Sequence, residues 1–241
     1  MHALNGKNAI ITGASKGVGR AIALKLAQES ANVALLARSK DKLDATTEQI
    51  TSKDGIASSV VCDLSQPEEV TSAISSCRRI FNDKVDILIN NAGVFLEKPT
   101  SEIELDEWEK TFNINLKAPF LMCREILPLM QQQKSGHIIN IASTSALKGH
   151  YNQAAYCASK HGLLGFSRAL AQEANPDKVR VNCISPGGIN TEFISGSHVA
   201  ERIQNQSVLE PDNVADLVLF ILKQPPNTDF PEITMERFKY S

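Results

Sequence analysis

The chain has 241 residues, of which 42% are hydrophobic and 22% charged, a length and composition typical of a globular protein with one full hydrophobic core. Its net charge of −2, without any basic tract, argues against partners that are bound through nucleic-acid phosphates or an anionic membrane surface. No apolar run approaches the roughly 20 residues that span a bilayer, and the N-terminal segment lacks the apolar core of a secretion signal.

Short apolar runs rich in β-branched residues alternate with longer helical stretches along the chain. The runs that predict strands are Asn8–Thr12, Asn32–Ala37, Ser58–Cys62, Val85–Asn90, His137–Ile141 and Val179–Ile184. The helix-like stretches are residues 18–29, 40–52, 67–81, 106–132, 152–174 and 211–223. The strand runs are nearly all apolar rather than alternating, as expected of strands that are covered on both faces.

This alternation predicts an α/β fold, a doubly wound parallel sheet with helices on both faces and right-handed crossovers. The pattern of Glu232–Phe238 predicts a further strand, which gives a sheet of six to seven strands. Neither a repeat nor a low-complexity linker divides the chain, so residues 1–241 are expected to form a single domain. Ligands of such sheets bind beyond the carboxyl ends of the strands.

A glycine-rich turn follows the first predicted strand. It reads Thr12-Gly13-Ala14-Ser15-Lys16-Gly17-Val18-Gly19 and opens an Ala/Leu-rich helix. Glycines at these spacings permit a tight turn, close approach to a pyrophosphate and close helix packing. The helix N-terminus then presents free N–H groups and a partial positive charge to phosphates. In this strand–turn–helix setting the pattern predicts a dinucleotide site rather than a plain glycine-rich connection.

The end of the second strand indicates which dinucleotide binds. An NAD site usually has a carboxylate about 20 residues after the glycines, which bonds the ribose 2′-hydroxyl. Here the strand ends Leu35-Leu36-Ala37-Arg38-Ser39, without an acid. Arg38 is suited to hold a 2′-phosphate through a charge-assisted fork, with Lys16 beside it in the glycine turn. The alternative is that both are solvated surface charges, but together with the missing acid they favour NADP(H).

A tyrosine and a lysine stand four residues apart in Tyr156-Cys157-Ala158-Ser159-Lys160, and therefore on one helical face. The ordinary tyrosine pKa is near 10, and a nearby ammonium together with an oxidised nicotinamide is expected to lower it. Ser143, at the end of the fifth strand, is placed to donate a hydrogen bond to a substrate carbonyl. Such a pair alone is usually an ordinary surface pair, and its occurrence with the glycine turn makes it a candidate catalytic site.

With these motifs in this order, the sequence resembles the short-chain dehydrogenase/reductase family in its ordinary-length branch, over about residues 5–223. The resemblance implies a Rossmann-type fold and a catalytic tetrad of Asn115, Ser143, Tyr156 and Lys160. It assigns Asp63 to the adenine amino group and Asn90-Asn91-Ala92-Gly93 to sheet support and the adenosine ribose. The implied cofactor-binding residues are Thr12, Gly13, Ser15, Lys16, Gly17, Val18, Gly19, Arg38, Ser39, Asp63, Leu64, Asn90, Ala92, Gly93, Tyr156, Lys160, Pro186, Gly187, Ile189 and Thr191.

The resemblance also implies a mechanism. The nicotinamide hydride passes to a carbonyl carbon held between Ser143 and Tyr156, and Tyr156 gives its proton to the developing alkoxide. Lys160 bonds the nicotinamide ribose and lowers the tyrosine pKa. Asn115 holds a water that links Lys160 to bulk solvent as a proton relay.

The substrate is a small carbonyl compound or alcohol, and its identity stays open. Similarity favours a 3-oxoacyl-[acyl-carrier-protein] reductase acting on an acyl thioester, with a general carbonyl or diketone reductase as the alternative. A nucleotide-sensing or interaction protein without catalysis is the alternative of another class, although all four tetrad residues are present.

Residues 188–209 are expected to form a short substrate loop over an open pocket. The tail, residues 228–241, lacks the family's terminal glycines. In the family this end of the chain often helps to form a tetramer, so a homodimer and a homotetramer are both open expectations.

The remaining candidate residues have weaker signals. The five cysteines are odd in number and scattered, which predicts reduced thiols and a cytoplasmic protein. The five histidines lack metal-ligand spacing, so no metal site is expected. Cys157 is expected to pack as a small apolar residue rather than act as a nucleophile. His150, Phe95 and Glu97 are candidates to line the substrate pocket.

Overall fold

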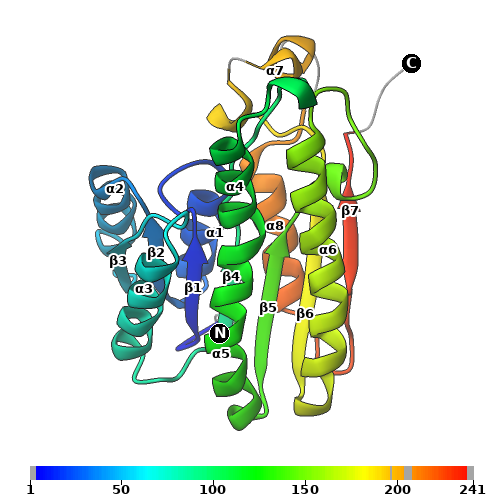
Figure 1. Ribbon diagram of the computed structural model, residues 1–241. Coiled ribbons are helices and arrows are strands. Elements are labelled where there is room, and N and C mark those ends of the chain that lie inside the picture. Colours follow the sequence, from blue (N-terminus) through cyan, green and yellow to red (C-terminus); the bar gives the residue numbers. More distant parts are fainter. Residues whose placement is uncertain (1–3, 196, 204–207, 238–241) are drawn as a thin grey trace.

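The computed structural model describes residues 4–195, 197–203 and 208–237 and places a seven-stranded sheet between two layers of helices (Figure 1). The strands are β1 (Asn8–Thr12), β2 (Asn32–Ala37), β3 (Ala57–Val61), β4 (Ile87–Asn90), β5 (Gly136–Ile141), β6 (Val179–Pro186) and β7 (Glu232–Met235). Their order is β3-β2-β1-β4-β5-β6-β7, and each neighbouring pair is parallel. The predicted α/β fold with a parallel sheet is confirmed, and the sheet has the larger of the two expected strand numbers.

The helices cover both faces of the sheet, with α1, α2 and α8 behind it and α3, α4, α5 and α6 in front in Figure 1. The α-helices are α1 (Gly17–Gln28), α2 (Lys40–Thr51), α3 (Pro67–Ile80), α4 (Leu105–Phe112), α5 (Ala118–Gln133), α6 (Ala154–Ala174), α7 (His198–Ile203) and α8 (Pro211–Leu222). Short helical turns occur at η1 (Thr100–Glu102), η2 (Asn113–Lys117), η3 (Thr144–Ala146), η4 (Asn175–Asp177) and η5 (Glu192–Ile194).

A hydrophobic core on each face of the sheet explains why the central strands are largely apolar. Along β1, Ala9 and Ile11 belong to the core shared with α1 and α8, whereas Ile10 belongs to the core shared with α3, α5 and α6. Successive side chains of a strand point to opposite faces, so a sheet covered on both sides needs apolar residues at every position. This arrangement leaves the carboxyl edge of the sheet as the place where polar groups gather.

The stretch 106–132, which the pattern predicted as one helix, is interrupted. It forms α4, the π-helical turn η2 and α5. The break coincides with Asn115, whose buried side chain bonds two other segments, and a π turn is a common way to redirect one residue within a helix. The sequence prediction missed it because the apolar periodicity continues on both sides of the turn.

The last strand is shorter than predicted and ends beside β6. The predicted run Glu232–Phe238 forms a strand only at Glu232–Met235, and Phe238 lies outside the described residues. Arg168 of α6 donates two hydrogen bonds to the carboxylate of Glu232 at 2.6 and 2.9 Å. At the other end of the strand, the backbone N–H of Gly187 donates to the carbonyl of Met235 at 2.7 Å. The chain therefore reaches the carboxyl edge of the sheet again after β7.

The region expected to form a loop at 188–209 contains the turn η5 and the short helix α7, with residues 196 and 204–207 outside the described part. All five cysteines are free and buried, as the prediction of reduced thiols requires, and Cys157 is among them. Among the described residues, no helix has the length and apolar character needed to cross a membrane.

His137 of β5 is a buried titratable residue away from the carboxyl edge. It is only 4% exposed and its Nε2 hydrogen-bonds with Oδ1 of Asn182. Asn182 in turn donates to Oδ1 of Asp229 at 2.7 Å. Burial, with a smaller contribution from the charge of Arg180, lowers the pKa of His137 from 6.5 to about 4 despite the opposing effects of Asn182 and Asp229. The ring is therefore neutral in the folded protein at pH 7.

We expect this histidine to make the fold sensitive to mild acid. Its folded pKa lies below its unfolded one, so its contribution to stability is full above pH 6.5 and is lost as pH falls towards 4, by up to about 3 kcal/mol. Urea unfolding of wild type and His137→Gln at several pH values measures this. The difference between the two free energies of unfolding should shrink on acidification. The same comparison with His198→Gln, whose side chain is 81% exposed, should show no such trend, and a constant difference for His137→Gln would contradict the prediction.

Candidate active site

A cavity of about 1150 Å³ lies at the carboxyl edge of the sheet and receives residues from the ends of β1 to β6. It brings together most of the residues predicted from sequence. Those that line it are Gly13, Ser15, Lys16, Gly17, Val18, Arg38, Ser39, Asp63, Leu64, Ala92, Gly93, Ser143, Tyr156, Lys160, Pro186, Gly187, Ile189 and Thr191. Thr12, Gly19, Asn90 and Asn115 do not line it.

The glycine turn is shaped by contacts that leave no room for side chains. Gly13 has φ +69°, and a Cβ there would lie 2.9 Å from the Cα of Ala92. A Cβ at Gly19 would lie 2.3 Å from the carbonyl oxygen of Gly13. Thr12 braces the turn, because its Oγ1 accepts from the backbone N–H groups of Asn91 and Ala92 at 3.0 and 3.1 Å. Thr12 and Gly19 thus shape the site without lining the cavity.

Helix α1 presents its N-terminus at this turn without a protein cap. No side chain caps it, and its first turn contains no acidic residue, whereas α4 and α8 both have capping boxes. The first N–H groups of a helix lack intrahelical partners and favour anions. With the glycine cradle beside it, this end of the cavity fits the pyrophosphate of a dinucleotide.

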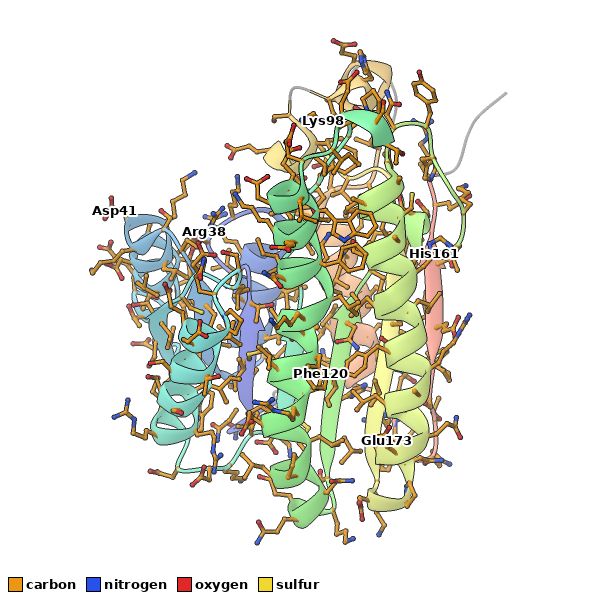
Figure 2. The ribbon with its side chains drawn as sticks, in the orientation of Figure 1. Arg38, Asp41, Lys98, Phe120, His161 and Glu173 are labelled. Atoms are coloured by element: carbon orange, nitrogen blue, oxygen red, sulfur yellow. The ribbon has the colours of Figure 1, made fainter. Side chains whose placement is uncertain are left out.

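The end of β2 carries a cluster of cations. Arg38, labelled in Figure 2, lies at the carboxyl edge of the sheet, with Nη1 4.0 Å from Oδ2 of Asp63. Ser39 and Lys42 line the same cavity. Lys42 was not predicted, although its position in the first turn of α2, immediately after Ser39, was a usable signal. The cluster fits a 2′-phosphate, since Arg binds phosphate through a fork and Lys as a point charge.

Lys16, the other predicted cation, is paired with an acid that the sequence analysis did not single out. Its Nζ lies 2.9 Å from Oε2 of Glu192 in η5, and both side chains are exposed. The hydrogen bond from Lys16, then its charge and more weakly that of Lys42, lower the pKa of Glu192. Glu192 therefore connects the glycine turn to the substrate-loop region and competes with any phosphate for Lys16.

The predicted catalytic side chains converge on one buried spot. Tyr156 and Lys160 of α6 are 5% and 3% exposed. Ser143 and Tyr156 line the same cavity, where the Ser143 side chain acts to lower the pKa of Tyr156, and Nζ of Lys160 donates to the carbonyl oxygen of Ile141 at 3.0 Å. Because Ser143 follows β5 directly, the sheet edge and one helical turn of α6 together set this geometry.

Burial dominates the titration of these groups. It raises the pKa of Tyr156 to about 12, although the hydrogen bond with Ser143 opposes the shift. Burial also lowers the pKa of Lys160 to about 8. The lowering of the tyrosine pKa by Lys160 together with an oxidised nicotinamide stays a prediction, because burial dominates in the chain by itself. The ammonium is turned to the Ile141 carbonyl and lies 6.0 Å from the centre of the Tyr156 ring, so desolvation outweighs attraction.

Asn115 is held by hydrogen bonds of its side chain, and its part in a proton relay stays a prediction. It is fully buried in η2, its Oδ1 accepts from the Val94 N–H at 2.8 Å, and its Nδ2 donates to the Val94 carbonyl and Ser159 Oγ, both at 3.0 Å. Both amide N–H bonds are used, so the side chain has no donor left for a relay water. Asn115 joins the segment after β4 to α6, next to Lys160.

Asn90 was predicted to bind cofactor, and this stays a prediction, since its side chain does not line the cavity. Its Nδ2 donates to Oδ1 of Asn140 at 2.8 Å, inside the sheet, and Asn140 donates to Ser167 Oγ at 2.8 Å. Since consecutive side chains at a strand end face opposite ways, Asn91 rather than Asn90 points to the glycine turn. Its Nδ2 donates to the carbonyl of Thr12 at 3.0 Å. Asn90 therefore supports the sheet.

An aromatic wall surrounds the reactive hydroxyls. The rings of Phe95 and Tyr156 meet edge to face with centroids 5.0 Å apart, and Phe193 lies 6.2 Å from each. Phe95 and His150, both candidates from sequence, line the cavity. Glu97 does not, and its carboxylate accepts from the N–H of His198. Phe193 was not predicted, because it belongs to no recognisable sequence motif.

Comparisons with known proteins agree with this site. The family described as short chain dehydrogenase matches residues 7–201. An uncharacterized oxidoreductase of Staphylococcus aureus strain MRSA252 is 34% identical over 235 residues, covering 98% of this chain and 99% of that protein. A 3-oxoacyl-[acyl-carrier-protein] reductase of Aquifex aeolicus is 34% identical over 228 residues, 92% of each chain.

A solved structure extends the likeness to three dimensions. The crystal structure of a metagenomic short-chain oxidoreductase in complex with NADP superposes with a TM-score of 0.84 and 34% sequence identity. The match covers 98% of this chain and all of that one. The fold and the order of the motifs are therefore shared along essentially the whole length.

The hydrogen bonds of the Asn115 side chain with Val94 and Ser159 should contribute to stability. Asn115→Ala removes the partners of the part-buried Val94 N–H and C=O and of the buried Ser159 hydroxyl, which should lower the free energy of unfolding by about 1–3 kcal/mol. Urea denaturation at pH 7 measures this. Asn227→Ala, at an exposed position, serves as the control and should change stability by less than about 0.5 kcal/mol. An Asn115→Ala variant with an unchanged free energy of unfolding would show that these hydrogen bonds do not hold the two segments together.

Proposed function

The chain belongs to the short-chain dehydrogenase family, and on that premise we propose that it is an NADPH-dependent oxidoreductase that interconverts a carbonyl and a secondary alcohol. The observation that carries the proposal is that Tyr156, Ser143 and Lys160 line the same cavity as the glycine turn and the uncapped N-terminus of α1. A proton donor and a dinucleotide cradle in one cavity are the two components that such a reaction needs.

The proposed mechanism assigns one task to each residue. The dinucleotide, when bound, supplies the hydride for reduction and takes it up in oxidation. Ser143 and Tyr156 hold the carbonyl oxygen by two hydrogen bonds, and Tyr156 donates its hydroxyl proton to that oxygen as the carbon becomes tetrahedral. Lys160 places a positive charge beneath this pair, where it stabilises the phenolate that remains. With Tyr156 protonated and Lys160 mostly charged at neutral pH, the chain is in the form that reduction requires.

The cofactor preference follows from the end of β2. Strand β2 ends without the acidic residue that an NAD site usually has. The cavity at this end is lined instead by Arg38, Ser39 and Lys42, and Oδ2 of Asp63 lies 4.0 Å from Nη1 of Arg38. We assign the 2′-phosphate of NADPH to Arg38 and Lys42. The NADP bound by the metagenomic relative supports this assignment.

The substrate we favour is a 3-oxoacyl thioester, because the Aquifex relative is a 3-oxoacyl-[acyl-carrier-protein] reductase. The second candidate is a small ketone or diketone, favoured by the aromatic wall of Phe95 and Phe193 beside Tyr156. NADPH oxidation followed at 340 nm with an acetoacetyl thioester, a diketone, an aromatic ketone and a sugar decides between them. If none of these is reduced while NADPH binds, the proposed activity is wrong.

Removing the phenol tests the proton donor. Tyr156→Phe should lower kcat by about 10²- to 10⁴-fold, because general acid catalysis contributes that much, and the Kd for NADPH from calorimetry should stay within about twofold. The matched control is Tyr151→Phe, since Tyr151 is 86% exposed in the turn that precedes α6 and does not line the cavity. A Tyr156→Phe enzyme with near wild-type kcat would remove this tyrosine from the mechanism.

The cofactor assignment has its own test. Arg38→Gln should raise the Kd for NADPH by about 10- to 100-fold, the value of one charge-assisted hydrogen bond, and Lys42→Gln should do so to a smaller extent. The Kd for NADH should change by less than about threefold in both. Arg20→Gln is the control, because Arg20 bonds Gln49 on the protein surface. Equal weakening of NADPH and NADH binding by Arg38→Gln would overturn the role in reading the 2′-phosphate.

A further inference from the structure

The C-terminal segment forms one wall of the active-site cavity. Beyond β7, Glu236 and Arg237 both line it. The backbone N–H of Gly187 holds this segment by donating to the carbonyl of Met235. A Cβ added to Gly187 would lie 3.8 Å from the Cα of Glu236 and 3.8 Å from the Cγ2 of Thr144, so these three residues are close together. Because Thr144 follows Ser143 directly, this wall stands beside the reactive hydroxyls rather than at the Arg38 end of the cavity.

The charges of this wall do not cancel. Lys148 and Glu236 form an ion pair, with Nζ and Oε1 3.3 Å apart, and so offset each other. Arg237 has no ion pair among the residues that the structure describes, and its buried Nη1 has no hydrogen-bond partner there. A guanidinium stays charged at any physiological pH and presents several N–H donors in a fork. A buried donor without an acceptor is costly, so this side chain is suited to an anionic group that enters the cavity.

Part of the cavity lining is apolar. Phe95, Phe193, Ile194 and Val199 line it, and the two phenylalanine rings contact the ring of Tyr156. A molecule bound at the hydroxyls would thus have aromatic surface and the Arg237 guanidinium within the same cavity. Of the other cations that line it, Lys16 pairs with Glu192 and Arg38 lies near Asp63, Lys160 bonds the Ile141 carbonyl, and Lys42 belongs to the cluster at the end of β2.

We propose that Arg237 binds the carboxylate of the substrate, and that the preferred substrates are oxo acids with an apolar body between the carbonyl and the aromatic wall. This inference rests on the proposed carbonyl reduction and narrows its substrate class, at the expense of neutral ketones and thioesters. The reaction stays balanced as before, with a hydride to carbon and the Tyr156 proton to oxygen. The carboxylate takes no part in the chemistry and serves to position the carbonyl.

Pairs of substrates that differ only in the carboxylate test this directly. We would measure kcat/KM for 3-benzoylpropionate and 4-benzoylbutyrate, and for their methyl esters, with NADPH. Wild type should prefer at least one acid over its ester by about tenfold or more. Arg237→Gln should lower kcat/KM for that acid by about 10- to 100-fold, mainly through KM, and change the value for the ester by less than about twofold.

Two further variants separate the guanidinium from general effects of charge or folding. Arg237→Lys keeps the charge without the fork and should recover part of the loss. Arg78→Gln removes one positive charge from α3, where Arg78 pairs with Asp83, and should leave the preference for the acid unchanged. The Kd for NADPH should be the same in all variants, and a rise for Arg237→Gln would assign Arg237 to the cofactor instead and overturn the proposal.

A binding measurement distinguishes failure of this inference from failure of the proposed function. Calorimetry of the NADPH-loaded protein compares 4-phenylbutyrate with 4-phenylbutyramide, neither of which can be reduced as a ketone. The acid should bind more tightly in wild type and lose that advantage in Arg237→Gln. If the acid binds so but no ketone is reduced, the proposed activity fails and the anion site stands. If esters are reduced as well as acids and the two probes bind equally, the anion site fails and carbonyl reduction stands.

Discussion

The rest of this molecule depends on one constraint, the burial of a parallel sheet on both faces. Because helices pack on each side, most side chains of the central strands are buried in the cores on the two faces. Polar groups of the site therefore gather where the strands end. The carboxyl ends of the strands all lie at one edge in a parallel sheet. That is why residues as distant in the chain as Gly13, Ser143 and Gly187 line a single cavity.

Polar contacts inside the fold then position the reactive groups. Asn115 ties the segment after β4 to α6, and Asn90, Asn140 and Ser167 connect β4 and β5 with α6. These amides do not touch the cavity, yet they hold α6, and with it Tyr156, against the end of β5. Buried hydrogen bonds of this kind are costly to break and specify one arrangement of elements. The precision of the catalytic cluster therefore comes from its supports as much as from its own residues.

The electrostatics of the cavity divide it into two ends with different tasks. At the end of β2, Arg38 and Lys42 face the place suited to a phosphate. At the end of β7, Arg237 faces the place where a substrate would sit beside Ser143. Between them, burial keeps the Tyr156 phenol protonated, while the ammonium of Lys160, one helical turn away, bonds the Ile141 carbonyl. The middle of the cavity therefore offers a proton donor next to one buried positive charge.

The sequence by itself determined the fold class, the glycine turn and the convergence of Ser143, Tyr156 and Lys160, because each depends on residues that are close in the chain or on the position of strand ends. Apolar runs reveal buried strands, and a four-residue spacing places two side chains on one helical face whatever surrounds them. Only the tertiary structure decided the rest. The facing of Asn90 and Asn91, the π turn at Asn115, the pairing of Lys16 with Glu192 and the approach of Arg237 to the cavity all depend on contacts between segments far apart in sequence. The direction of the Tyr156 pKa shift was decided there too, since it follows from how deeply the ring is buried, and burial is a property of the packed molecule that no local pattern of residues contains.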